Sequence, residues 1–128
     1  MNPFGYSDPV WRLFNETPRA GAPTEGSVSG RGATPASRAV VALHLKLSGA
    51  SVADARFQAY GCPTTIAVGA WLAQQAVGRS LESLAALDAP AIRQALEIPE
   101  ERAHCALIGE DALKAALAKA GKSGGPSH

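Results

Sequence analysis

Two cysteines, Cys62 and Cys105, are the side chains of this 128-residue chain best suited to metal or sulfur chemistry. Cys62 stands in a Gly-Cys-Pro turn, directly before a predicted helix that begins at Pro63. Backbone N–H groups at a helix N-terminus carry partial positive charge, which favours the thiolate form of a nearby cysteine. Such a thiolate could bind a metal ion or take part in sulfur transfer. From position alone, a small buried residue at a tight turn is an equally good interpretation.

His104 and Cys105 form a second pair of soft ligands, at the start of the last predicted helix. Taken alone, an adjacent His-Cys pair is better explained as an exposed histidine beside a core cysteine. Cys62 shifts this balance, because it lies at the start of another helix and three ligands from two helix N-termini suit a tetrahedral metal. The pattern therefore predicts a metal site made of Cys62, His104 and Cys105.

Other polar motifs offer less. His44 lies on the polar face of a predicted strand, and we expect it to be solvated. The segment Gly121-Lys-Ser lacks the upstream glycine and the following helix of a phosphate-binding loop. Outside the cysteine site we find no nucleophile with an oriented base and no cofactor fingerprint, so we expect a protein that is not an enzyme.

Composition narrows the function classes. The formal net charge is +1 and the basic residues are scattered, whereas nucleic-acid binders concentrate them on one face. The apolar stretches are too short to span a bilayer, and the first residues lack the pattern of a secretory signal. We therefore expect a cytoplasmic protein with no nucleic-acid or membrane partner. In a reducing compartment, two cysteines favour metal or sulfur chemistry over a structural disulfide.

Two strands are predicted ahead of Cys62. Apolar residues alternate with other residues from Val41 to Leu47, which is typical of a strand with one buried face. A second strand is expected from Val52 to Tyr60, with Ala53, Ala55, Phe57 and Ala59 on one side. The short turn between them contains glycine, so we expect the two strands to pair antiparallel.

Helical spacing follows Cys62. Pro63 suits a first helical turn and Gly78 suits the end of a helix. Further helices are expected after Ser80, after a cap at Asp88, and from Ala103 to Ala120, with Pro99 ending the one before. Together the elements predict an α+β fold, with a small antiparallel sheet of about three strands and helices packed on one face.

We divide the chain into three parts. Residues 1–35 are expected to be a flexible N-terminal segment, because the stretch 21–32 is rich in Gly, Pro, Ser and Thr and cannot bury enough apolar surface to order alone. Within it, residues 10–14 could form one amphipathic turn that docks on the core. Residues 36–120 are expected to be the folded domain, and residues 121–128 a disordered tail.

A set of short motifs extends over nearly the whole chain. They are Tyr6-Ser7, Pro18-Arg-Ala-Gly21, Asp54-Ala-Arg-Phe-Gln-Ala-Tyr-Gly-Cys62, Ile66-Ala67, Gly78-Arg-Ser-Leu81, Leu96-Glu-Ile-Pro99, His104-Cys105 and Gly109-Glu-Asp-Ala-Leu-Lys-Ala-Ala116. Together they resemble the iron–sulfur cluster assembly scaffold family, which includes IscU and the N-terminal domain of NifU. The resemblance implies the IscU/NifU-like fold and a role in iron–sulfur cluster assembly.

The resemblance also implies roles for particular residues. In the family, three cysteines hold a nascent [2Fe–2S] cluster or a zinc ion, with help from a histidine and an aspartate. Cys62 and Cys105 resemble the second and third of these cysteines, and His104 resembles the histidine. Cys105 would also accept sulfur, as a persulfide, from a cysteine desulfurase. The expected cofactor is iron or a [2Fe–2S] cluster, with zinc as an alternative.

One family motif is altered. The first family cysteine lies in a Pro-x-Cys-Gly-Asp motif, which in this chain reads Pro35-Ala-Ser37-Arg38-Ala39. Ser37 could be only a weak fourth ligand, because its hydroxyl is hard and stays protonated near neutral pH. Ala39 cannot bind a metal. Arg38 is expected to place a positive charge near the site and to repel Fe²⁺.

The segment expected to contact a chaperone is altered as well. The family's Leu-Pro-Pro-Val-Lys segment, which a dedicated Hsp70-type chaperone recognises, reads Ile98-Pro99-Glu100-Glu101-Arg102 here. Two apolar residues have become acidic, so a groove built for apolar side chains would bind the segment poorly. The remaining expected partners are a cysteine desulfurase and apo iron–sulfur client proteins.

Three hypotheses of different classes follow. We favour a divergent scaffold that binds iron or a [2Fe–2S] cluster, with its fourth ligand supplied by Ser37, a small thiol or a second subunit. The alternative is an IscU-like adaptor or regulator that assembles no cluster, or a zinc- or persulfide-binding protein. The third is a stable α+β domain whose thiols are inert.

Overall fold

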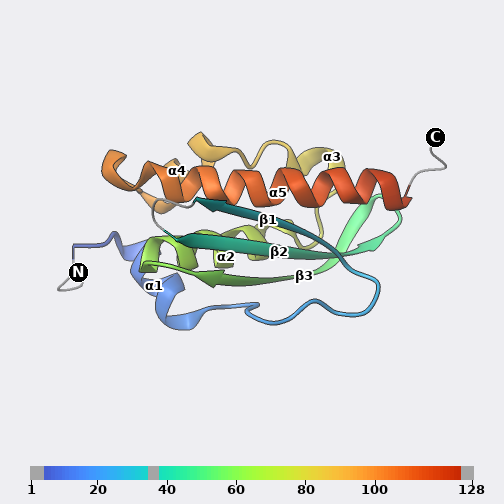
Figure 1. Cartoon of the computed structure of the whole chain (residues 1–128), viewed down its shortest axis with the longest axis horizontal. Helices are drawn as coiled ribbons and strands as arrows, with labels where there is room; N and C mark the ends of the chain where they lie inside the picture. The colour runs from blue at the N-terminus through green and yellow to red at the C-terminus, as the bar shows by residue number, and fades with distance from the viewer. Residues whose placement is uncertain (1–4, 35–37, 125–128) are drawn as a thin grey trace.

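The computed structural model describes residues 5–34 and 38–124, in which an antiparallel sheet is covered on one face by helices (Figure 1). The sheet has the order β1-β2-β3. This arrangement confirms the predicted α+β fold. The strands are β1 (Val28–Thr34), β2 (Ala39–Ser48) and β3 (Ser51–Tyr60), and the helices are α1 (Asp8–Glu16), α2 (Pro63–Ala76), α3 (Leu81–Leu84), α4 (Ala89–Leu96), the 3₁₀ helix η1 (Glu100–Arg102) and α5 (Ala103–Gly124).

The predicted hairpin is present as β2 and β3, and it contains one irregularity. Lys46 pairs with Asp54, whereas Leu47 pairs with Val52, so Ala53 is an extra residue in β3. Such a bulge shifts the alternation of side chains by one position. The expectation that Ala53 faces the same side as Ala55 is therefore wrong: Ala53 is exposed, and Val52 is buried in its place.

His44 differs from its prediction. Its side chain is 6% exposed rather than solvated. Nδ1 lies 2.7 Å from Ser29 Oγ on β1, and Nε2 lies 2.9 Å from Gln58 Oε1 on β3. Both ring nitrogens therefore have partners from the neighbouring strands, which makes burial of this polar side chain acceptable.

The sheet was expected to have about three strands, but the third, β1, was not located in the sequence, because its glycines leave no pattern of side chains. Both of its glycines, Gly30 and Gly32, face α5 at very short range. A Cβ atom on Gly30 would lie 2.1 Å from the backbone nitrogen of Ala116, and one on Gly32 would lie 2.1 Å from the carbonyl oxygen of Ile108. The glycines thus let α5 lie directly on β1, and the close packing supplies the order that the composition does not suggest.

Both chain ends of the described region contain more structure than expected. The segment 1–35, which we expected to be flexible, contributes α1 and β1. The hydroxyl of Ser7 caps α1 by accepting from the backbone N–H of Val10 at 3.2 Å, and Val10 is buried. Helix α5 extends past the expected end at Ala120 to Gly124. Residues 125–128 lie outside the described residues.

The helix boundaries near the cysteines follow the predicted signals. Helix α2 begins at Pro63, directly after Cys62, and Gly78 beyond its end has φ +86°. Gly61 has φ +145°, a conformation that favours glycine, and so turns the chain from β3 into α2. The carboxylate of Asp88 caps α4 by accepting from the N–H of Ala91 at 3.0 Å. Among the described residues, no helix combines the length and apolar character that crossing a membrane requires.

Candidate functional site

The starts of α2 and α5 bring the two cysteines together. Cys62 is the N-cap residue of α2, and Cys105 is in the first turn of α5. Their sulfur atoms lie 3.9 Å apart, although the residues are 43 positions apart in sequence. His104 Nε2 lies 3.6 Å from the sulfur of Cys105. The structure therefore brings together the three residues that the sequence singles out.

Thr65 completes this cluster. Its hydroxyl oxygen lies 3.4 Å from the sulfur of Cys105 and 3.6 Å from the sulfur of Cys62, and the side chain is fully buried. Thr65 was missed in the sequence analysis. The available signal was its place three residues after an N-cap cysteine, on the first turn of the same helix.

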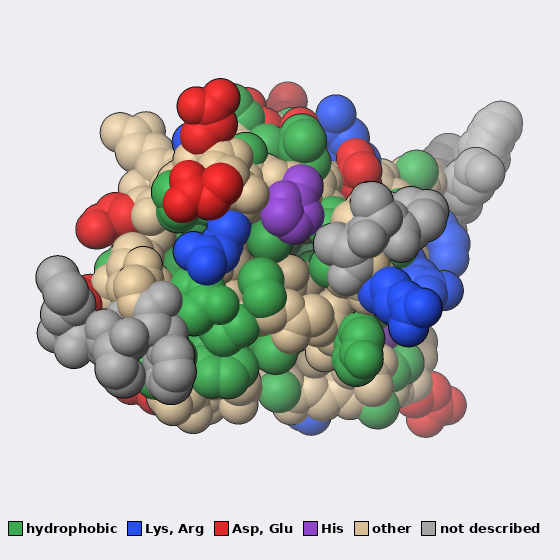
Figure 2. Space-filling model, turned by 60° about the vertical axis from the view of Figure 1, so that its left-hand side comes forward, with side chains coloured by type: hydrophobic (Ala, Val, Ile, Leu, Met, Phe, Trp, Pro, Cys, Tyr) green, Lys and Arg blue, Asp and Glu red, His purple; other side chains and the backbone are tan. Residues whose placement is uncertain are grey.

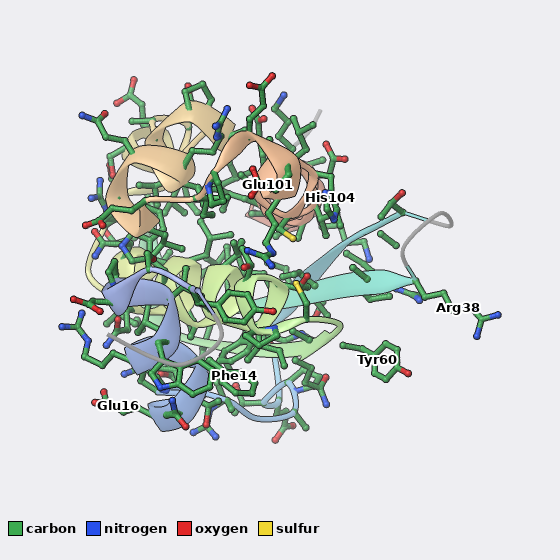
Figure 3. All side chains as sticks on the ribbon, turned by 90° about the vertical axis from the view of Figure 1, so that its left-hand side faces the viewer. Phe14, Glu16, Arg38, Tyr60, Glu101 and His104 are labelled. Carbon is green, nitrogen blue, oxygen red and sulfur yellow. The ribbon has the colours of Figure 1, made fainter. Side chains whose placement is uncertain are left out.

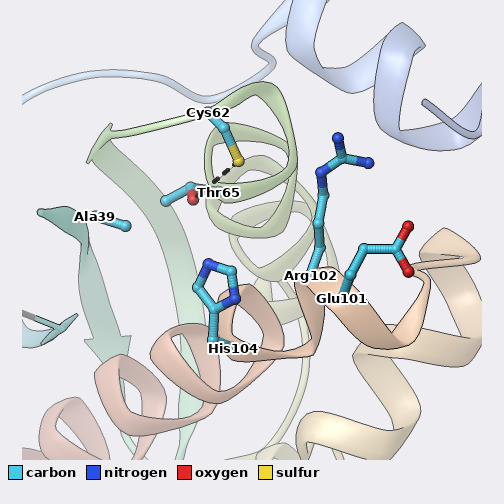
Figure 4. A pocket seen from close by; sticks show the side chains of 6 residues that line it. All are labelled: Ala39, Cys62, Thr65, Glu101, Arg102 and His104. Atoms are coloured by element: carbon cyan, nitrogen blue, oxygen red, sulfur yellow. Dashed lines mark hydrogen bonds between the residues drawn. The ribbon is translucent and has the colours of Figure 1, made fainter. Parts of the chain in front are cut away.

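A cavity of about 390 Å³ opens beside the cluster (Figure 4). Cys62 is half-buried and lines the cavity, whereas Cys105 is 0% exposed and is not among the residues that line it. The sulfur of Cys62 is thus the one that a molecule in the cavity meets. The lining residues are Ala39, Cys62, Thr65, Glu101, Arg102 and His104.

The two thiols have opposite acidities. The S–H of Cys105 donates to the sulfur of Cys62, and this is the main reason that the pKa of Cys62 falls to about 4. Burial opposes the shift, and the backbone amide and hydroxyl of Thr65 add to it. The pKa of Cys105 is raised, first because its proton is held by this contact with Cys62 and then because the thiol is buried. At neutral pH the pair therefore holds one thiolate, on Cys62, and one thiol.

One residue of the altered family motif, Ala39, lies at the sheet side of the cavity. Ala39, the first residue of β2, is buried and lines the cavity with a methyl group. Ser37, the predicted weak fourth ligand, lies outside the described residues. Arg38 was expected near the site, but this was wrong: its side chain is exposed and points away from the molecule (Figure 3). Its φ of +58° is the left-handed conformation that the family's glycine adopts most easily.

The cation at the cavity is Arg102 instead, which the sequence analysis did not place there. Its guanidinium group lies 4.5 Å from the centre of the Tyr6 ring, so it connects the N-terminal segment to the site.

Hydrophobic side chains gather on the face drawn in Figure 2, near a histidine and a basic side chain. A shallow cavity of about 420 Å³ beside α1 is lined by Tyr6, Trp11, Phe14 and Pro63.

The metal-ligating side chains are paired rather than gathered around one point. Across residues 5–34 and 38–124, no group of three or more His, Cys, Asp or Glu side chains stands ready to hold a metal ion. Cys105 is the link, because its sulfur is close both to the sulfur of Cys62 and to Nε2 of His104. The site therefore offers two adjacent ligand pairs that share one sulfur.

The profile of one protein family, the NifU-like N terminal domain, matches residues 5–123. The chain belongs to this family. Among members of the wider group, the iron–sulfur cluster assembly scaffold protein IscU of Escherichia coli (strain K12) is 36% identical over 91 residues, which cover 70% of this chain and 71% of that protein. An IscU scaffold protein of Archaeoglobus fulgidus is 26% identical over 113 residues, covering 88% and 74%.

Solved structures show the same fold for this NifU-like domain. The SUF-system protein FiSufU of Fervidobacterium islandicum AW-1 superposes with a TM-score of 0.74 at 18% identity, over 88% of this chain and 96% of that one. The N-terminal NifU-like protein of Brucella abortus gives a TM-score of 0.59 at 18% identity, over 91% and 83%. At these identities the likeness concerns the fold alone.

Proposed function

We propose that this NifU-like domain is an iron–sulfur cluster assembly scaffold whose cargo, iron or a nascent [2Fe–2S] cluster, binds to Cys62, Cys105 and His104. The spacing of these side chains carries the proposal. Ligands at about 2.3 Å for sulfur and about 2.0 Å for nitrogen around one tetrahedral metal place two sulfurs roughly 3.8 Å apart, and sulfur and nitrogen roughly 3.5 Å apart. The corresponding distances here are 3.9 Å and 3.6 Å.

The ligand set is smaller than the one that the family motif implies. In the sequence, Ala39 stands where the family motif has the aspartate, and Ser37 stands where it has the first cysteine. A fourth ligand would come from Ser37, from a small thiol or from a second subunit. Fewer thiolates hold iron less tightly, so we expect cargo that is easily lost.

The proposed partners follow from the role. A cysteine desulfurase would supply sulfur to the thiol pair, and apo iron–sulfur proteins would receive the cluster, in the reducing cytoplasm. A chaperone groove that recognises apolar peptides would bind the segment Ile98-Pro99-Glu100-Glu101-Arg102 poorly. Ile98 is buried, and the residues after it that are exposed include Glu100 and Glu101.

The test is anaerobic reconstitution of the full chain with ferrous iron and sulfide, followed by desalting, metal and sulfide analysis, and absorption and Mössbauer spectra. We expect iron and sulfide to be retained by the wild type and lost in Cys105→Ser and His104→Ala. The double variant Ser37→Cys/Ala39→Asp, which restores the family ligands, should retain more. A wild type that keeps neither iron nor sulfide would refute the scaffold role.

The second candidate is a zinc- or persulfide-binding adaptor that docks on a desulfurase without building clusters. The observation that favours it is the absence, among the described residues, of three converging ligands, together with Ala39 in the cavity wall. The same protein loaded with zinc decides between the two. Retention of zinc but not of iron and sulfide, with the desulfurase captured by the wild type, would support the adaptor.

A further inference from the structure

The two thiols differ in their access to the cavity. Cys62 is half-buried and contributes to the cavity wall, while Cys105 is 0% exposed and lies outside the lining. A sulfur donor that enters the cavity therefore reaches the sulfur of Cys62 before that of Cys105. The resemblance to the scaffold family implies the opposite order, with Cys105 as the acceptor.

We propose that Cys62 takes up sulfur from a persulfide donor, and that Cys105 then displaces it as hydrogen sulfide by forming a disulfide with Cys62. This inference rests on the part of the proposed function in which the thiol pair accepts sulfur, and it does not depend on bound iron. The substrate class is a persulfide, R–S–SH, carried by a desulfurase or by a small thiol.

The first step is a transfer of sulfur without net oxidation. The thiolate of Cys62 attacks the outer sulfur of R–S–SH, a new S–S bond forms at Cys62, and the donor leaves as R–S⁻. Cys62 then carries the persulfide. The size of the cavity, about 390 Å³, leaves room for the added sulfur and for the end of the donor.

The second step releases the sulfur in reduced form. The sulfur of Cys105 attacks the Cys62 sulfur, the bond between Cys62 and the outer sulfur breaks, and HS⁻ leaves and takes up the proton of Cys105. The two cysteine sulfurs are oxidised to a disulfide, and the outer sulfur gains the electron pair. A dithiol reductant of the thioredoxin class, or dithiothreitol in the laboratory, returns both thiols.

The distances suit this second step. The two sulfurs are 3.9 Å apart and a disulfide bond is about 2.05 Å long, so the side chains must approach by roughly 2 Å. The hydroxyl of Thr65 contacts both sulfurs and can accept the proton of Cys105 while donating its own to the departing sulfide. Thr65 therefore holds both sulfurs in contact and relays the proton from Cys105 to the departing sulfide.

The cysteine content of the chain also supports the formation of a disulfide between Cys62 and Cys105. The chain has two cysteines, and Ser37 replaces the first cysteine of the family motif. The resolving thiol for a persulfide on Cys62 is therefore Cys105. Because the disulfide removes two of the proposed metal ligands, the released sulfide leaves through the cavity, and iron can bind to Cys62 and Cys105 only after the disulfide has been reduced.

The test uses the metal-free, reduced full chain without oxygen. One equivalent of glutathione persulfide is added, samples are taken over time, and released sulfide is measured together with the intact mass and the disulfide-linked peptides. We expect wild type first to gain the mass of one sulfur, located on Cys62, and then to lose it together with two hydrogens as the Cys62–Cys105 disulfide forms. Each protein molecule should release one sulfide.

Two variants separate the roles of the thiols. Cys105→Ser should keep the persulfide on Cys62 and release sulfide at least about tenfold more slowly, and Cys62→Ser should take up no sulfur at Cys105. A stable persulfide on wild-type Cys105, or sulfide release from wild type without a disulfide, would overturn the proposal. If the variants do not fold, as judged by circular dichroism, the order of the wild-type species decides alone.

Failure of this inference is distinct from failure of the scaffold role. Retention of iron and sulfide with no disulfide after persulfide treatment would leave the scaffold role standing and remove the release step. Disulfide formation with sulfide release, in a chain that retains no iron, would support the release step and refute the scaffold role.

Discussion

Cys62 and Cys105 occupy the starts of two neighbouring helices, yet their chemistry is opposite. Cys62 is an N-cap residue that faces a cavity and has a pKa of about 4. Cys105 is in the first turn of its helix, is fully buried, and has a raised pKa. The comparison teaches that a helix start does not determine the ionisation of a cysteine by itself, since depth and the neighbouring thiol decide it.

The contact between the sulfurs explains why the two differ. Two thiolates about 4 Å apart would repel each other by about 4 kcal/mol at an effective dielectric constant near 20. The pair therefore keeps one proton over a wide pH range, and titrates as a unit. The proton stays on Cys105 because Cys62 is closer to solvent and to the amides at the start of α2.

The largest expected effect is a difference in alkylation rate between the two thiols of the metal-free, reduced chain. At pH 7 iodoacetamide should modify Cys62 at least about 100-fold faster than Cys105, because Cys62 is an accessible thiolate. Since its pKa is lowered, the Cys62 rate should stay flat from pH 8 to pH 5 and fall only near pH 4. Peptide mass spectrometry over time measures both sites. Equal alkylation rates at the two cysteines would show that Cys62 and Cys105 do not differ in ionisation and access.

Removing the Cys105 proton tests the cause directly. Cys105→Ala deletes the donor to Cys62, so the pH midpoint of Cys62 alkylation should rise by at least about one unit, equivalent to about 1.4 kcal/mol. Cys105→Ser, which keeps a hydroxyl donor, is the matched control and should show a smaller rise. An unchanged midpoint in the alanine variant would show that the start of α2, not Cys105, sets the acidity of Cys62.

Thr65→Val should have an intermediate effect. Valine keeps the shape of threonine but removes the hydroxyl that contacts both sulfurs, so we expect a loss of about 1 kcal/mol in the free energy of unfolding. The alkylation midpoint of Cys62 should also rise, by less than in Cys105→Ala. Urea denaturation and alkylation measure the two effects. Thr65→Ser serves as the control, and a valine variant identical to wild type in both would remove Thr65 from the cluster.

The smallest effect is expected at Asp54, which forms ion pairs outside the cysteine site. It serves as a reference for how a carboxylate changes the stability of the fold at acidic pH. Burial raises its pKa, but hydrogen bonds from Arg19 and Arg56 outweigh this and lower it. Because the folded pKa is below the unfolded one, Asp54 stabilises the fold above about pH 4 and loses this contribution as pH falls. The ion pairs are exposed, so Asp54→Asn should cost less than about 0.5 kcal/mol at pH 7.

The comparison of unfolding curves between pH 6 and pH 3 checks this expectation. Wild type and Asp54→Asn should converge as the pH falls, because protonation removes the same charge. A difference that persists at pH 3 would mean that Asp54 acts through packing rather than charge.

The features that were predictable are those encoded within a few residues. Alternating apolar side chains indicated the hairpin, and capping residues and prolines marked the starts of α2 and α4. The same local signals placed Cys62 and Cys105 at helix starts. Strand β1 was missed because its glycines lack side chains that form a pattern; their role appears only when α5 lies 2.1 Å from the place a Cβ would take.

The polar surroundings were less predictable. His44 is buried because Ser29 and Gln58 reach it from two other strands. Arg38 points away from the cavity, and Arg102 lines it instead, held against Tyr6 from the N-terminal segment. Each of these placements depends on a contact between residues far apart in the chain.

The sequence by itself indicated that Cys62, His104 and Cys105 belong to one candidate site, because helix starts and the family motifs are local patterns. It also determined that Ser37 and Ala39 replace two family ligands. Only the tertiary structure decided that Cys62 is the accessible thiolate and Cys105 the buried thiol. The physical reason is that protonation and access depend on how α2 packs against α5, which brings together sulfurs 43 residues apart to 3.9 Å.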